Sequence, residues 1–469
     1  MKKIYLKRLL YVALLIGIIV FICYHFNFFS CNNDQNYIQK FLYQRHRYDT
    51  VVLDNEVIII DGFKAKNGAT LFSIQKSGGQ WKIAQELKLD KYVKTPVDCL
   101  VANNDWLVIN CDSRSNSVII FRKNNKIWEY YNKIDGDTKR FGDYGSLELD
   151  GNSLIISDGS VEGHGIVFVY DLKSQPPSLK QKIYPPKGII RDGFGFGNFF
   201  ILRDNWLIIN DGGAYFSQED KIKYGLKPSD ESTSFSNGKR NPIRRPCILL
   251  FAKNPKSEWF FVQDIFFSLP HPANSILRND EEKISMNINP LFPNLISLVN
   301  NKLFLYDHEK YYIFGLNDMN WKYEGSSRPP FIPTWVEPKS PYRALYHFES
   351  IVIDSIYSAH FRYDGSIDIY RTTDNADWKS IWQINFYDPL KDDILKRESL
   401  AFKVRVNHHI VVAKFYWFLQ EKKTTPTNTG KITIFEIDSQ KGPICVFQME
   451  AFDNGTLTPC DCSQNFKIH

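Results

Sequence analysis

Short apolar segments separated by polar turns repeat along most of this chain. In residues 146–172, SLELDGNSLIISDGSVEGHGIVFVYDL, two apolar segments flank a tight Asp-Gly-Asn turn, and a third follows a polar gap. Short apolar runs bounded by Gly, Asn and Asp are typical of β-strands joined by hairpins. The same order, often followed by a Trp and one more strand, returns at residues 51–87, 99–134, 146–183, 199–265, 295–325, 349–384 and 401–449.

The repeat predicts an all-β fold. Each copy offers four short strands, and a four-stranded sheet repeated about every fifty residues is the blade of a β-propeller. A single blade cannot bury both of its faces, whereas a closed ring of blades does. We therefore predict a seven-bladed β-propeller over residues 47–450, followed by a C-terminal tail at 451–469. The copies at 295–325 and 349–384 are the weakest, so six or eight blades also fit.

The N-terminal segment has a different pattern. Lys2, Lys3, Lys7 and Arg8 precede an apolar run over residues 9–29, which is long enough to span a bilayer, and the first acidic residue is Asp34. By the positive-inside rule, the N-terminus stays in the cytoplasm and the remainder is exported. Residues 1–31 are thus predicted to be a membrane anchor or signal segment, and residues 32–46 a linker.

Four interpretations of this segment stay open. It fits an uncleaved signal-anchor helix, a lipoprotein signal with lipid attached to Cys31, or a cleaved secretory signal. The fourth is a buried helix of a cytosolic protein. Phe28 and Phe29 before Ser30 are unusual in a lipoprotein signal, which favours the anchor.

Charge argues against one class of partner. The chain of 469 residues carries a net charge of +6, of which the four basic residues of the leader contribute four. The body is left with +2, which is not the electrostatic footprint of a nucleic-acid-binding protein.

The cysteines permit disulfides in an exported protein. Apart from Cys23 and Cys31, six cysteines remain, and six can pair in fifteen ways. Cys99 and Cys111 lie at the two ends of one predicted hairpin and are the candidate pair; alternatively, both are small buried hydrophobic residues. Cys460 and Cys462 form a lone C-x-C, which is weak evidence for a metal site and fits a tail.

Short motifs in the repeat resemble a known family. Phe141-Gly142 before the third copy, Gly193-Phe194-Gly195 before the fourth, and the GGQW, NKIW and KSEW turns are similar to the bacterial FG-GAP repeat, which is related to the propeller of integrin α chains. This resemblance covers residues 45–450 and implies a propeller fold. Integrin-type repeats bind calcium in an Asp-rich D-x-D-x-D-G loop. The corresponding joints here, LDNE, ANND, LDGN, RDNW and VNNK, are too short and poor in carboxylates, so we predict no metal site.

Long connections predict which face carries a site. The gaps at 212–246 and 414–430 and the links at 266–283 and 325–343 fall on one face, and long loops in compact folds are usually functional or disordered. Trp335 and Trp417 are candidate ligand contacts on these loops, although an aromatic residue there can also plug the top of a blade.

Basic residues recur in the links that enter successive blades. Such a ring of cations would suit a carboxylate, phosphate or sulfate. The alternative is that these residues pair with neighbours such as Asp143, Asp192 and Glu398 and tie blades together. The recurring residues are Arg47, Lys94, Arg140, Arg191 and Arg397.

Catalytic signatures are scarce, and no cofactor motif occurs. His408 and His409 are adjacent on a predicted strand, so they would point to opposite faces. The sequence favours a membrane-tethered, extracytoplasmic propeller that acts as a binding or assembly module for an envelope protein or polysaccharide. A propeller-fold hydrolase or lyase acting on envelope polysaccharide is the alternative, because carboxylates can converge from separate blades. A structural envelope scaffold is the third possibility.

Overall fold

A computed structural model gives the structure of this chain, and residues 48–469 form one compact unit. The described residues are 48–61, 69–92, 97–111, 116–138, 141–142, 147–159, 161–187, 196–197, 199–203, 205–211, 217–219, 235–236, 239–240, 247–265, 296–299, 301–306, 311–327, 351–354, 356–361, 366–372, 380–386, 400–417, 428–452, 457–460, 462 and 466–468. The predicted N-terminal helix and Cys31 lie outside them. Among the described residues, no helix has the length and apolar character needed to cross a bilayer.

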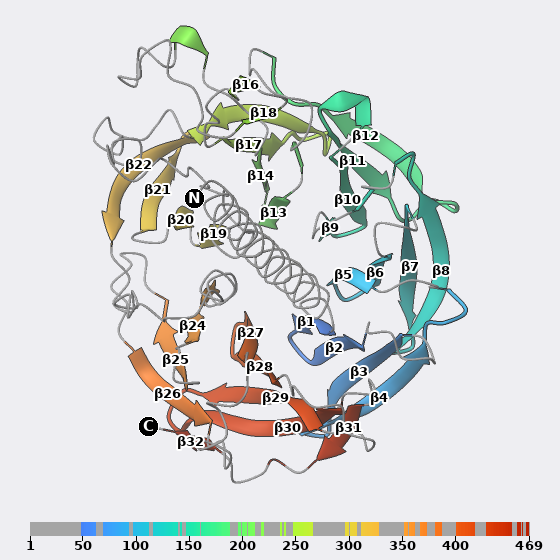
Figure 1. Cartoon of the computed structure of the whole chain (residues 1–469), viewed down its shortest axis with the longest axis vertical. Coiled ribbons are helices and arrows are strands. Elements are labelled where there is room, and N and C mark those ends of the chain that lie inside the picture. Colours follow the sequence, from blue (N-terminus) through green and yellow to red (C-terminus); the bar gives the residue numbers. More distant parts are fainter. Residues whose placement is uncertain are drawn as a thin grey trace, which may run out of the picture. The chain divides into compact units, whose positions relative to one another are not determined.

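Seven antiparallel sheets confirm the predicted repeat (Figure 1). Blade 1 consists of β1 (Tyr48–Leu53), β2 (Glu56–Asp61), β3 (Thr70–Ser77) and β4 (Gln80–Lys88). Blade 2 consists of β5 (Val97–Ala102), β6 (Trp106–Cys111), β7 (Ser117–Asn124) and β8 (Ile127–Asp135). Blade 3 consists of β9 (Leu147–Asp150), β10 (Ser153–Asp158), β11 (Ile166–Asp171) and β12 (Ser178–Ile183). Blade 4 consists of β13 (Phe199–Arg203), β14 (Trp206–Asn210), β17 (Ile248–Lys253) and β18 (Trp259–Asp264). Blade 5 consists of β19 (Ile296–Val299), β20 (Lys302–Tyr306), β21 (Tyr311–Asn317) and β22 (Asn320–Ser327).

Blades 6 and 7 each have a fifth strand. Blade 6 consists of β23 (Ile351–Ile353), β24 (Tyr357–Phe361), β25 (Ser366–Arg371), β26 (Ser380–Phe386) and β32 (Phe466–Ile468). Blade 7 consists of β27 (Leu400–Asn407), β28 (Ile410–Trp417), β29 (Asn428–Asp438), β30 (Gly442–Phe452) and β31 (Leu457–Cys460). The insertion of blade 4 also holds a small hairpin, β15 (Phe235–Ser236) and β16 (Lys239–Arg240), and a short 3₁₀ turn, η2 (Val161–Gly163), lies in blade 3.

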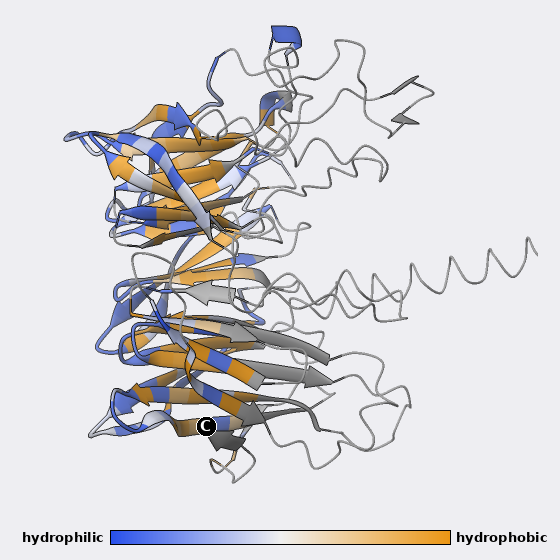
Figure 2. Cartoon of the chain, turned by 90° about the vertical axis from the view of Figure 1, so that its left-hand side faces the viewer, coloured by the Kyte–Doolittle hydropathy of each residue, from blue (hydrophilic) through white to orange (hydrophobic). Residues whose placement is uncertain are grey.

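The core lies between blades because both faces of each sheet are buried. In β2, consecutive residues Val57, Ile58, Ile59 and Ile60 are all fully buried, and consecutive strand residues point to opposite faces. Apolar clusters accordingly join blade 1 to 2, 2 to 3, 3 to 4, 4 to 5, 6 to 7 and 7 to 1. Hydrophobic residues fill the middle of the strands, and hydrophilic residues gather at the hairpin ends (Figure 2). The ring closes through packing of blade 1 on blade 7.

The Phe-Gly dipeptides form joints between blades. Phe141 is buried in the cluster between blades 2 and 3, and Gly142 (φ +72°) lies against Asn110 of β6. In the next joint, Phe196 is buried between blades 3 and 4, and Gly197 (φ +80°) lies against Ser157 of β10. Phe196-Gly197 therefore has the same role as Phe141-Gly142. It follows directly after Phe194-Gly195, the dipeptide that the sequence suggested.

The Trp of the outermost strand ties its blade to the preceding one. Trp128 of β8 donates its Nε1 hydrogen to Glu56 Oε1 of blade 1 at 2.9 Å, and Lys123, opposite Trp128 in the sheet, pairs with the same carboxylate. Blade 1 repeats this arrangement against blade 7, with Trp81 Nε1 donating to Glu436 Oε1 at 2.6 Å. The Trp-containing turns noted in the sequence thus serve the blade interfaces.

A glutamine of the preceding blade makes two hydrogen bonds to the backbone of the same Trp. Gln85 of β4 accepts a hydrogen bond from Trp128 N at 2.8 Å and donates one to Trp128 O at 2.9 Å. The same two bonds join blade 3 to 4 and blade 4 to 5, through Gln181 with Trp259 and Gln263 with Trp321.

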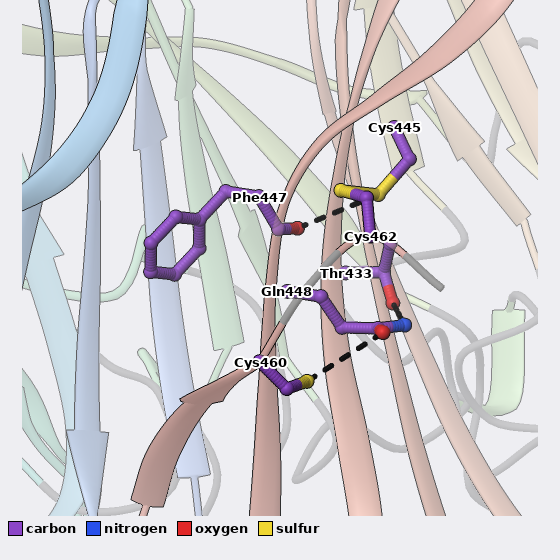
Figure 3. Close-up of a disulfide and its surroundings, with 6 residues drawn as sticks. All are labelled: Thr433, Cys445, Phe447, Gln448, Cys460 and Cys462. Carbon is purple, nitrogen blue, oxygen red and sulfur yellow. Dashed lines mark hydrogen bonds between the residues drawn. A yellow bond between two sulfur atoms is a disulfide. The ribbon is translucent and has the colours of Figure 1, made fainter. Parts of the chain in front are cut away.

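The last residues, assigned from sequence to a C-terminal tail, contribute two strands. β31 pairs with β30 of blade 7, and β32 pairs with β26 of blade 6. A disulfide between Cys445 of β30 and Cys462 fastens the segment between these two strands (Figure 3). Beside it, Cys460 Sγ donates to Gln448 Oε1 at 3.6 Å. We call residues 457–468 the C-terminal strap, because they bridge blades 6 and 7.

The sequence suggested that the two adjacent histidines lie within a strand, but the structure places them in a turn. His408 and His409 form the hairpin turn between β27 and β28, and His408 has a φ of +47°. The His408 backbone N–H donates to Asp354 Oδ2 of blade 6 at 2.8 Å, so this turn contributes to a blade joint.

Candidate functional site on the ring axis

The side chains of most predicted site residues lie outside the described part of the chain. These are Arg47, Lys94, Arg140, Arg191, Arg397 and Trp335. Trp417 is the last residue of β28, opposite Leu400, and its side chain is not described. The basic ring and the two aromatic contacts stay predictions.

The candidate disulfide is also not decided. Cys99 is buried in β5 opposite Asn110, and Cys111 ends β6 opposite Val97, where the register of the two strands shifts. The side chain of Cys111 is outside the described set, so this pair remains a prediction.

A group of unlike charges lies on the innermost strands, which surround the ring axis (Figure 1). Glu148 stands on β9 two residues before Asp150, which pairs with Ser153 at the hairpin. Arg405 stands on β27 two residues before Asn407, which pairs with Ile410 at the equivalent hairpin. Glu148 and Arg405 therefore occupy the same level of blades 3 and 7.

Arg203 completes this group from a third blade. It is the last residue of β13 in blade 4. It lies two residues closer to the hairpin turn of its blade than Glu148 does in blade 3. Its Nη1 donates to the carbonyl of Leu202 at 2.8 Å, while the Leu202 N–H donates to the Glu148 carboxylate. We call Glu148, Arg203 and Arg405 the axial cluster.

The surroundings of Glu148 shift the pKa of its carboxyl. Burial of the carboxyl raises the pKa of Glu148 to about 7, although the Arg203 charge, the Leu202 N–H and the Arg405 charge all lower it. Its side chain retains partial exposure, Arg405 is likewise half-buried, and Arg203 is exposed. The axial cluster therefore contains a buried carboxyl that changes charge near neutral pH, together with two permanent cations.

Other buried carboxylates serve the blades themselves. Asp158 accepts a 2.6 Å hydrogen bond from Thr138, and Asp368 accepts hydrogen bonds from Tyr370 and Gln383. Glu56, described above, belongs to a Trp joint. These groups are held by side chains of the fold, whereas the charges that act on Glu148 belong to arginines of other blades. No group of three or more His, Cys, Asp or Glu among the described residues is arranged to hold a metal ion.

The raised pKa predicts a pH-dependent effect of Glu148→Gln. Between about pH 4.5 and 7 the unfolded chain ionises Glu148 while the folded chain keeps it protonated, so wild-type stability falls with rising pH and levels off above 7. The neutral amide avoids this cost. At about pH 8 we expect Glu148→Gln to be more stable than the wild type by about 2 kcal/mol, with no difference near pH 4.

Urea denaturation at both pH values measures this effect. Glu129→Gln, which changes an exposed carboxylate of β8, is the matched control and should leave both values unchanged. A gain for Glu148→Gln of the same size at both pH values would contradict the assignment of the effect to ionisation.

The long loops and basic links do not point to this cluster, because its three residues belong to strands. A signal was present: the positions equivalent to Glu148 in blades 1, 2 and 4 are Val51, Val101 and Ile201. Glu148 therefore differs from the β-branched residues at this position of the three other copies. Alignment of the copies can reveal this difference.

The axial arrangement and the seven sheets define the protein as a seven-bladed β-propeller with a charged axis. The chain matches no protein-family model and no curated protein. Among solved structures it is similar to a candidate 6-phosphogluconolactonase from Bacteroides fragilis, at 11% identity and a TM-score of 0.43 over 90% of this chain and 100% of that one. A protein of unknown function from Desulfotomaculum acetoxidans is similar at 8% identity and a TM-score of 0.41, over 86% and 98% of the two chains. Likeness at this level carries no argument about activity.

Proposed function

We propose that this chain is a membrane-tethered, extracytoplasmic propeller that acts as a binding module, with its ligand at the axial cluster. The observation that carries this proposal is the position of Glu148, Arg203 and Arg405 on the inner strands of blades 3, 4 and 7, where both arginine charges act on the Glu148 carboxyl. Placing Glu148 and Arg405 at partly buried positions costs solvation energy, and apolar residues at the equivalent positions of blades 1 and 4 show that the fold does not require a charge there. A ligand provides a reason for them.

Two features support the extracytoplasmic tether. The basic residues and apolar run of the leader fit an anchor with the body exported. The Cys445–Cys462 disulfide belongs to the kind of bond that persists in oxidising compartments and is rare in the cytosol. The two equivalent Phe-Gly joints also support a divergent relationship to the FG-GAP repeat, as the sequence resemblance implies.

The composition of the axial cluster favours binding over polysaccharide hydrolysis. Glycoside hydrolases typically use two carboxyl groups, one as acid and the other as base or nucleophile. Within the described residues, the axial cluster combines one carboxyl with two guanidinium groups. Such a set suits recognition of an anion.

A thermal-shift panel tests the proposed function. The full chain in detergent is heated with envelope polysaccharides, their neutral and acidic fragments, and peptides, and each compound is afterwards checked by chromatography for chemical change. We expect at least one compound to raise the melting temperature of the wild type while staying intact.

Two variants show whether the shift comes from the axis. Arg405→Gln should abolish most of it, whereas Lys441→Gln, which removes an exposed cation from the β29–β30 turn of the same blade, should retain it. Conversion of a compound to product would favour the enzyme alternative. A shift that survives in Arg405→Gln would move the ligand away from the axis.

A further inference from the structure

We propose that Cys460 is an exchange thiol, which lets the C-terminal strap change between two disulfide-bonded forms. In the first form, the Cys445–Cys462 bond ties the strap to blade 7. In the second form, Cys460 and Cys462 are joined within the strap, and Cys445 is a thiol. The inference goes beyond the proposed function, because it concerns a reactive site on blades 6 and 7. It is carried by a thiol placed two residues from an exposed disulfide cysteine.

The thiol and the disulfide lie on one face of blade 7 (Figure 3). Cys460 is opposite Gln448 of β30 and donates its thiol hydrogen to Gln448 Oε1. Gln448 is paired with Thr433, and Cys445 is paired with Phe435. Thr433 and Phe435 are alternate residues of β29, so their partners Gln448 and Cys445 share a face of the sheet.

A short chain of hydrogen bonds positions the thiol. Gln448 is buried, and its Nε2 donates to Thr433 Oγ1 at 3.0 Å. The amide oxygen of Gln448 is thereby directed toward the strap, where it accepts the hydrogen bond from Cys460 Sγ at 3.6 Å. This contact keeps the Cys460 side chain on the face where the disulfide lies.

Access determines which sulfur is attacked. Cys462 is exposed, whereas Cys445 is partly buried and packs against the apolar cluster between blades 6 and 7. Cys460 is partly exposed, while Cys99 and Cys247, the other thiols of the described residues, are buried. Thiol–disulfide exchange depends on the access of the attacking thiol and on the sulfur that it reaches. Attack is therefore expected at Cys462.

The exchange needs no external oxidant or reductant. The Cys460 thiolate forms a bond to Cys462 Sγ while the Cys445–Cys462 bond breaks. Cys460 gives its thiol proton to solvent before the attack, and the Cys445 thiolate that leaves takes up a proton. One disulfide and one thiol are present before and after the step, so no sulfur is oxidised or reduced overall.

The exchange changes how firmly the strap is held. Alternate residues of a strand are about 6.6 Å apart, whereas the Cβ atoms of a disulfide lie about 4 Å apart, so a Cys460–Cys462 bond must bend the strap. The tied form is therefore the major one. In the second form, only strand pairing on β30 and β26 holds the strap, and β32 has three residue pairs. Release of β32 would open the outer edge of β26, and such an edge can pair with another chain.

Trapping of thiols with excess N-ethylmaleimide tests the inference. The oxidised full chain is treated without reductant, and peptide mass spectrometry identifies the labelled cysteines and the remaining disulfides. We expect a major species labelled at Cys460 and a minor species that is labelled at Cys445 and contains a Cys460–Cys462 bond.

Three variants assign the minor species to the exchange. Cys460→Ser removes the attacking thiol and should lower labelling of Cys445 at least about tenfold. Cys247→Ser, which removes a buried thiol of blade 4, is the matched control and should be labelled at Cys445 like the wild type. Lys467→Pro breaks the pairing of β32 with β26 and should increase labelling of Cys445, because a released strap bends more easily. The melting temperature of each variant shows that it is folded.

The alternative results each overturn this inference. Equal labelling of Cys445 in the wild type and in Cys460→Ser would show that Cys460 does not exchange. Labelling of Cys462 in place of Cys445 would show attack on the other sulfur. Equal labelling of Cys445 in the wild type and in Lys467→Pro would show that the exchange is not coupled to the strap.

Discussion

Replacing Gly197 with Ala is expected to lower the free energy of unfolding by about 3 kcal/mol. Gly197 has a φ of +80°, which an L side chain rarely adopts, and a Cβ there would lie 2.8 Å from both Ser157 Cβ and Val167 Cγ2 of blade 3. Neither atom is the far end of a flexible side chain, so the joint between blades 3 and 4 must open to relieve the clash. Chemical denaturation of the purified variant measures the loss.

Gly151 offers the matched control for this prediction. It has a φ of +55° in the β9–β10 hairpin of blade 3, and a Cβ there would meet nothing within 4 Å. Gly151→Ala therefore introduces backbone strain alone and should cost about 1 kcal/mol. Equal losses for the two variants would contradict the role of Gly197 in holding one blade against the next.

Replacing Cys462 with Ser is expected to destabilise the protein by about 3 kcal/mol. The disulfide closes a loop with a sequence separation of 17 and fixes the C-terminal strap between blades 7 and 6. Without it, the unfolded chain gains entropy, and the short β32 must hold its place on β26 by three residue pairs. The midpoint of denaturation by guanidinium chloride under oxidising conditions measures the effect.

Reduction of the wild type provides the control for this second prediction. In dithiothreitol the wild type and Cys462→Ser should unfold with the same free energy, because any other disulfide is reduced in both proteins. If oxidised wild type and variant denature at the same midpoint, the strap is held by its strands and not by the disulfide.

The candidate site was less accessible to sequence reasoning than the fold. Loop length and basic links directed attention to one face and to Arg140, Arg191 and Arg397, which lie outside the described residues. The axial cluster instead uses residues within strands that are distant in sequence. Only the order of the blades around the ring brings Glu148 near Arg405, because no local pattern encodes which inner strands face each other across the axis.

The sequence by itself determined the all-β blade repeat, because the four strands common to every blade come from one continuous segment. Hairpin turns and apolar runs act over a few residues, so the two-sided burial of a strand such as β2 is already visible in its four consecutive apolar residues. The tertiary structure alone decided that Phe196-Gly197 forms the joint, that residues 457–468 bridge two blades, and that the charges of Arg203 and Arg405 act on Glu148. These features depend on contacts between segments far apart in the chain, and their geometry exists only once the ring has closed.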